Sequence, residues 1–259
     1  MSRIVLVCLH GWGGSKDSFQ ELRNAMADDT VTILTPDLPG FGDEPEPPRA
    51  WGTDEYADWV EHWIKTQREL QIPASASRPA LSDVALEPVE RFFLLGHSHG
   101  GRIAIRLAAR GGLPIAHLFL CAPAGIWHPW QLKRVVGYVL AKLGRIVTAL
   151  PGMRRLYPLG RKLLYKLMGV HDYERASPVM QQTLIRVTRE DLRGELSEIR
   201  IPTDIFWGTD DRHTPFVDGK IIHAGITGSR FHVFAGVRHR VHREKAAEIA
   251  AAIRSSSHA

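Results

Sequence analysis

The chain has 259 residues, of which 44% are hydrophobic and 24% charged, which is the composition of an ordinary globular protein. This length is sufficient for one large α/β domain with a buried core. We see no signal peptide and no apolar stretch as long as a membrane span, so the expectation is a cytoplasmic protein. The two cysteines, Cys8 and Cys121, lie in apolar runs and are expected to be buried side chains rather than a disulfide or a metal pair.

The net charge of +5 is concentrated in one segment. Residues 124–170 contain nine basic side chains and no acidic one, so the remainder of the chain is net negative. Such a segment is either a solvated helix face or a contact for an anionic substrate group, an acidic carrier protein or an anionic membrane surface. Nucleic acid is disfavoured because no recognised binding module accompanies the charge. The nine residues are Lys133, Arg134, Lys142, Arg145, Arg154, Arg155, Arg161, Lys162 and Lys166.

Strands and helices are expected to alternate in the first half of the chain. Apolar runs rich in β-branched residues predict buried strands, and apolar side chains at helical spacing predict the helices between them. The expected strands are Arg3 to Leu9, Val31 to Leu34, Arg91 to Leu95 and Ile115 to Cys121, and the expected helices follow Ser15, run from about Asp54 to Leu70, and follow Gly101.

The pattern changes to helices alone from Pro123 to about Glu198 and then returns to alternation. Within that interval apolar stripes predict helices over 132–150, 161–168 and 178–188. Strands at Thr203 to Trp207 and Arg230 to Phe234 follow, with helices at Val217 to Ala224 and Arg243 to Arg254. The prediction is an α/β fold: a mostly parallel sheet with helices on both faces, formed by residues 1–122 and 199–259, and a helical cap inserted at 123–198.

A Gly-x-Ser-x-Gly sequence lies between the predicted strand at 91–95 and the helix after it. Strand, tight turn and helix are the context in which this sequence forms a nucleophile elbow. The turn strains the serine backbone, so Gly96 and Gly100 must lack side chains, and Gly101 lets the helix pack close to the sheet. Ser98 is therefore the candidate nucleophile.

The chain resembles the α/β-hydrolase superfamily over nearly its whole length. The motifs that carry the resemblance are His10-Gly11 after the first strand, the loop from Asp37 to Gly42, the segment from Gly208 to Pro215, and the order Ser98, Asp211, His239. The Gly11-Trp12-Gly13 entry and the basic cap are more loosely similar to esterases that act on acyl chains held by acyl carrier protein.

This resemblance assigns the base and the acid. His239 follows the last strand and is expected to take the serine proton, with His242 as its nearest rival. Asp211 lies four residues before Pro215 and is expected to orient His239, with the adjacent Asp210 as the alternative.

The oxyanion hole is expected to come from two backbone N–H groups, those of His99 and Trp12. His10, Gly11, Trp127 and Trp130 are candidates for the substrate pocket.

The function expected from these residues is hydrolysis of a small or medium carboxylic ester through a covalent acyl-enzyme, with no metal or cofactor. Hydrolysis of a C–C bond in a diketone-type substrate would use the same three side chains. A non-hydrolytic ligand-binding protein on the same fold is the alternative from another class.

Overall fold

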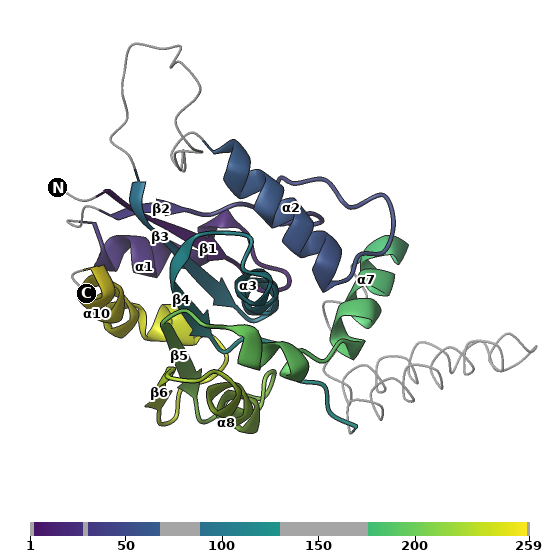
Figure 1. Cartoon of the computed structure of the whole chain (residues 1–259). Helices are drawn as coiled ribbons and strands as arrows, with labels where there is room; N and C mark the ends of the chain where they lie inside the picture. Colours follow the sequence, from purple (N-terminus) through teal and green to yellow (C-terminus); the bar gives the residue numbers. More distant parts are fainter. Residues whose placement is uncertain (1–2, 28–30, 68–88, 130–175, 258–259) are drawn as a thin grey trace, which may run out of the picture.

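The computed structural model describes residues 3–27, 31–67, 89–129 and 176–257. Its centre is a six-stranded, fully parallel sheet in the order β2-β1-β3-β4-β5-β6, which confirms the predicted fold class (Figure 1). The strands are β1 (Arg3–Leu9), β2 (Val31–Leu34), β3 (Val89–His97), β4 (Ile115–Cys121), β5 (Thr203–Gly208) and β6 (Arg230–Phe234).

The central strands are continuous apolar runs, without the alternation of polar and apolar residues that a half-exposed strand shows. They are accordingly buried on both faces of the sheet. Val7 pairs with Leu94 across β1 and β3, and Leu94 pairs with Leu118 across β3 and β4. All three side chains are fully buried. Cys8 and Cys121 are also buried, as free thiols, as the sequence predicts.

Helices cover both faces of the sheet (Figure 1). On one face α1 (Gln20–Ala25) packs against α9 (Val241–Glu244) and α10 (Ala246–Ser257). On the other lie α2 (Thr53–Thr66), α3 (His99–Arg110) and α8 (Phe216–Gly225), of which α2 and α3 pack together. The apolar stripe of α3 is fully buried, and the helix ends where Gly111 adopts a left-handed conformation.

Two helices differ from the prediction. The expected helix from Arg243 to Arg254 is divided at Lys245, whose φ of −123° is not helical, into α9 and α10. The helix after Ser15 begins with a 3-10 turn at Lys16–Phe19, because the Ser15 and Ser18 side chains cap it reciprocally.

Of the inserted segment, the structure describes α7 (Pro178–Arg189) and a 3-10 helix at Arg193–Glu198. Hydrogen bonds fasten α7 and the residue after it to the start of α2: Trp51 N donates to Thr183 Oγ1 at 3.1 Å, and Thr53 N donates to Glu190 Oε1 at 3.0 Å. The helices expected over 132–150 and 161–168, and all nine basic residues of the segment, lie outside the described residues. In the described ranges we find no helix with both the length and the apolar character needed to cross a bilayer.

Candidate active site

Ser98 occupies a strained turn between β3 and α3. Its φ of 51° and ψ of −111° are rare for a residue with a side chain. The turn is held on both sides: Ser98 N donates to the Cys121 carbonyl at 3.2 Å, and Ala124 N donates to the Ser98 carbonyl at 2.8 Å. The backbone strain is therefore maintained by the end of the adjacent strand β4.

The glycines around Ser98 are required by close backbone contacts. A Cβ on Gly96 would lie 2.5 Å from the Gly100 carbonyl oxygen, and one on Gly100 would overlap the carbonyl of Leu9. A Cβ on Gly101 would lie 2.5 Å from Cβ of Pro123. The turn therefore leaves no room for a side chain at any of these three positions.

Asp211 and His239 meet at the carboxyl ends of the two neighbouring strands β5 and β6. Nδ1 of His239 lies 2.7 Å from Oδ2 of Asp211. The loops that carry them are joined by two backbone bonds, from Thr209 N to the Phe234 carbonyl and from Asp210 N to the Val237 carbonyl, each at 3.0 Å. This spacing lets Asp211 hold the His239 ring with Nε2 turned away from the carboxylate.

Three further hydrogen bonds stabilise the Asp211 carboxylate. His213 N and Thr214 N donate to Oδ1 at 2.8 and 3.0 Å, and the Thr214 hydroxyl donates to Oδ2 at 2.8 Å. Burial alone would raise the pKa of Asp211, but the hydrogen bonds from His239, Thr214 and His213 outweigh it and hold the pKa below its ordinary value. The neighbouring Asp210 is exposed and bonds to the Thr209 hydroxyl instead. Of the two acids, Asp211 is the one that contacts His239.

His97, the residue before Ser98, holds the main chain of His239 through a hydrogen bond. Its Nε2–H donates to the His239 carbonyl at 3.0 Å, and its ring lies 3.7 Å from that of His242, measured between centroids. Burial lowers the pKa of both rings, that of His242 to about 3, so both are neutral near pH 7. His242 packs between His97 and Phe19, which favours a structural role over the alternative of a catalytic base.

His10 fixes the loop that follows β1. Its Nδ1–H donates to the Gly11 carbonyl at 2.8 Å, and its Nε2 accepts from Leu38 N at 3.0 Å. The side chain is fully buried, and burial lowers its pKa. These contacts favour a positioning role over direct contact with substrate. Gly11 lies against the elbow, because a Cβ on it would be 3.1 Å from Cβ of Ser98.

Trp12 and His99, the two residues expected to supply oxyanion N–H groups, are neighbours. Their rings meet edge to face with centroids 5.4 Å apart. Phe41 packs against the Trp12 ring at 4.9 Å, and Tyr56 packs against His99 at 4.8 Å. The His99 side chain is buried, which lowers its pKa well below the ordinary value. The structure thus brings the Gly11–Trp12 loop and the start of α3 together.

The other two candidates for the substrate pocket are Trp127 and Trp130. Trp127 is half-buried on the segment after β4, and its carbonyl accepts from Arg193 Nη2 at 2.9 Å. Trp130 lies outside the described residues. Among the residues that are described, we find no group of three His, Cys, Asp or Glu side chains arranged to hold a metal ion.

Two supporting contacts were not predicted from the sequence. The Thr214 hydroxyl bonds to Asp211, and its position three residues after that acid is a signal that could have been used. His128 and Asp218 form a buried pair with Nε2 and Oδ1 2.5 Å apart, linking the segment after β4 to α8. Their separation of 90 residues leaves no local pattern to detect.

Comparison with known proteins gives the family. The model of the Alpha/beta hydrolase family matches residues 6–252. The AB hydrolase superfamily protein YisY of Bacillus subtilis is 28% identical over 262 residues, covering 94% of this chain and 88% of that protein. A pimeloyl-[acyl-carrier protein] methyl ester esterase of Neisseria meningitidis is 25% identical, covering 89% of this chain and 84% of that protein.

Solved structures agree with the fold. An esterase from Exiguobacterium antarcticum superposes with a TM-score of 0.71 at 21% identity, covering all of this chain and 93% of its own. With the family model matching nearly the whole length, the chain belongs to the alpha/beta hydrolase family.

Proposed function

We propose that this protein is a serine hydrolase that cleaves a carboxylic ester through Ser98, His239 and Asp211. The observation that carries the proposal is the contact of His239 Nδ1 with Asp211 Oδ2 at 2.7 Å, at the same sheet edge as the strained Ser98 turn. A positive φ at a serine has a backbone cost, and such strain is retained where it positions a functional group.

The proposed reaction has two halves. His239 Nε2 takes the Ser98 proton as Oγ attacks the ester carbonyl, and the backbone N–H groups of His99 and Trp12 hold the oxyanion of the tetrahedral intermediate. The intermediate collapses as the protonated His239 gives its proton to the leaving alcohol, which leaves an acyl group on Ser98. Water, deprotonated by His239, then attacks this acyl-enzyme, and the acid is released as His239 returns the proton to Ser98 Oγ. Asp211 keeps His239 in the tautomer with the proton on Nδ1 throughout.

The ester class is supported by the relatives, which include an acyl-carrier methyl ester esterase at 25% identity and lipases at 22 and 23% identity. This chain covers only 62% of the length of each of those lipases. We further propose that residues 123–198 form a cap over Ser98. Its fastening to α2 through Thr183 and Glu190 supports a cap anchored at its C-terminal end.

The test is hydrolysis of chromogenic esters of rising acyl length by the native protein and by Ser98→Ala. We expect turnover of short or medium esters, a loss of at least several hundredfold in the variant, and labelling of native Ser98 by a fluorophosphonate. Turnover of a diketone substrate but of no ester would favour C–C hydrolysis instead. Absence of both turnover and labelling would favour the non-hydrolytic ligand-binding alternative.

A further inference from the structure

A hollow lies at the edge of the sheet opposite to Ser98. It has a volume of about 520 Å³ and is lined by the amino-terminal parts of β3 to β6, by residues just before β5 and β6, and by the last turn of α10. Arg91 and Ser98 are seven residues apart along β3 and the turn that follows, which at about 3.3 Å per strand residue separates the hollow from Ser98 by roughly 20 Å. Ligands of open α/β sheets ordinarily bind at the carboxyl ends of the strands, so this hollow is separate from the site described above.

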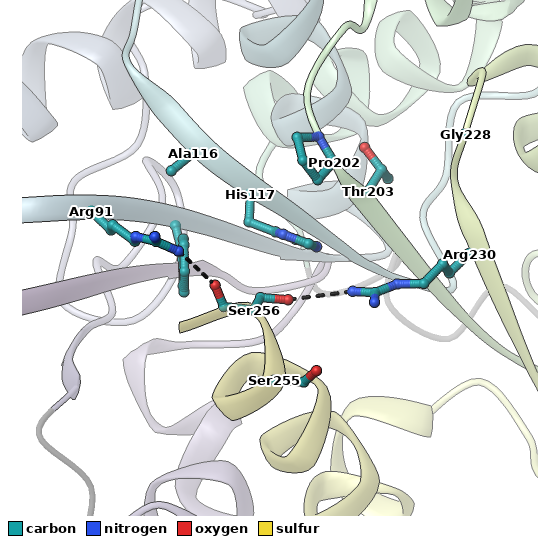
Figure 2. A pocket seen from close by; sticks show the side chains of 10 residues that line it. Arg91, Ala116, His117, Pro202, Thr203, Gly228, Arg230, Ser255 and Ser256 are labelled. Atoms are coloured by element: carbon teal, nitrogen blue, oxygen red, sulfur yellow. Dashed lines mark hydrogen bonds between the residues drawn. The ribbon is translucent and has the colours of Figure 1, made fainter. Parts of the chain in front are cut away.

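The hollow is lined by two arginines and by no acidic residue that the structure describes. The arginines are Arg91 and Arg230, which line it together with His117. The two arginines reach Ser256 from opposite sides (Figure 2). Arg91 Nη1 donates to the Ser256 carbonyl at 3.0 Å, and Arg230 Nη2 lies 3.4 Å from the Ser256 hydroxyl. The two guanidinium groups therefore lie on either side of Ser256, in the lining of the same hollow.

A buried carboxylate beneath the hollow fixes one of these arginines. Asp204 has no exposed side-chain surface and accepts from Arg230 Nε at 2.8 Å and Nη2 at 2.5 Å. It also accepts from His117 Nε2 at 2.7 Å and His232 Nε2 at 2.6 Å. Because Asp204 holds Arg230 and His117 in place, a ligand would not have to order them, and this lowers the entropic cost of binding.

Both arginines have N–H groups that make no hydrogen bond to the side chains and main chain that the structure describes. Arg230 employs Nε and Nη2, which leaves Nη1, and Arg91 employs Nη1, which leaves Nη2 and Nε. Asp204 balances the charge of Arg230, whereas Arg91 bonds to a carbonyl, and it forms no ion pair with the carboxylates whose side chains the structure describes. The arginines are accessible: the Arg230 side chain is 54% exposed, and Arg91 is partly exposed.

We propose that this hollow binds a phosphate group, as inorganic phosphate or as the head of a phosphate monoester. Phosphate carries close to two negative charges and three terminal oxygens at neutral pH, and it matches the forked donors of guanidinium groups. Arg91 and Arg230 would each contact a different oxygen of the phosphate, and the polar residues Thr203, Ser255 and Ser256 line the same hollow. A carboxylate has fewer oxygens and half the charge, so it should bind more weakly.

The test is calorimetric titration of the full chain with inorganic phosphate at constant ionic strength, with sodium chloride and sodium acetate as comparison titrants. We expect saturable binding of one phosphate per chain. Arg91→Gln should weaken this binding about tenfold, through loss of a charge-assisted hydrogen bond. Arg91→Lys keeps the charge but not the fork and should lie between the two. Arg189→Gln, which removes an exposed arginine from α7, is the matched control and should bind as the native chain does.

Two results would overturn the proposal. One is a phosphate response no larger than that of chloride or acetate at the same ionic strength. The other is unchanged phosphate affinity in both Arg91 variants when circular dichroism shows that they are folded. In a phosphate-soaked crystal we expect density between Arg91 and Arg230, and phosphate bound only elsewhere would count against the assignment.

Discussion

His97 donates a hydrogen bond from Nε2 to the main-chain carbonyl of His239, across a distance of 3.0 Å. The residue before the proposed nucleophile thereby holds the backbone of the proposed base. The same imidazole packs against Gly11, where an added Cβ would lie 2.8 Å from His97 Nδ1. One buried side chain therefore sets the spacing between the elbow, the loop after β1 and the loop after β6.

His97→Leu should reduce kcat with little change in KM. The variant leaves the His239 carbonyl without its donor, at a cost of about 1–3 kcal/mol in the free energy of unfolding, and relaxes the position of the base. A loss of roughly tenfold in kcat corresponds to about 1.4 kcal/mol. His97→Gln can still donate and should recover part of the loss. Steady-state kinetics and urea unfolding measure both effects, and a Leu variant with native kcat would show that the contact is not needed for catalysis.

Asp211→Asn should abolish most activity, whereas Asp210→Asn should not. The amide cannot replace the carboxylate that holds His239 in the tautomer with Nδ1 protonated, and comparable substitutions reduce kcat by about 10⁴. Asp210 is exposed and contacts Thr209, so it is the matched control. The kcat/KM of both variants on the best chromogenic ester decides between the adjacent acids. A larger loss in the Asp210 variant would reverse their assignment.

The sequence predicted what depends on local pattern. Six strands, the parallel sheet and the glycines of the elbow follow from runs of apolar residues and from steric limits at a tight turn. The choice of Asp211 over Asp210 came from the family resemblance and not from local pattern, because it depends on which carboxylate faces the amides of His213 and Thr214. His10 was predicted to line the pocket, and its two bonds to main-chain atoms become evident only in three dimensions.

Clusters of polar side chains from different strands could not be predicted from the sequence either. Asp204 meets His117 from 87 residues earlier and His232 from 28 residues later, because β4, β5 and β6 are neighbours in the sheet. No fixed spacing connects such residues, and each alone resembles an ordinary polar residue in a strand. Their association is a consequence of strand order and register.

Asp204→Asn should destabilise the protein more at pH 7 than at pH 3. Burial would raise the pKa of Asp204, but hydrogen bonds from His117, His232 and Arg230 outweigh it, so the folded-state pKa lies below the ordinary value of about 3.9. A lowered pKa stabilises the fold above the ordinary value, and this contribution is lost as the pH falls through the folded-state pKa. The cost at pH 7 should be about 3 kcal/mol, the lower end for a buried pair because Arg230 is half exposed. Urea unfolding at both pH values measures the difference between native and variant, and an equal difference at both would contradict the prediction.

Gly100→Ala should prevent formation of the elbow, whereas Gly194→Ala should be tolerated. A Cβ on Gly100 would overlap the Leu9 carbonyl, and Gly100 N also donates to the His10 carbonyl at 3.0 Å. The Leu9 carbonyl belongs to the backbone and cannot move away by changing rotamer, as a side chain could. The loss in the free energy of unfolding should therefore exceed the usual range of about 1–3 kcal/mol for an overpacked core. A Cβ on Gly194 would meet no described atom within 4 Å, and Gly194 has no positive φ, so alanine there should be neutral or slightly stabilising. Thermal unfolding and fluorophosphonate labelling of both variants provide the comparison. A Gly100 variant that unfolds at the native temperature and labels normally would mean that the strand and the elbow can separate at no cost, contrary to the close packing of β1 against α3.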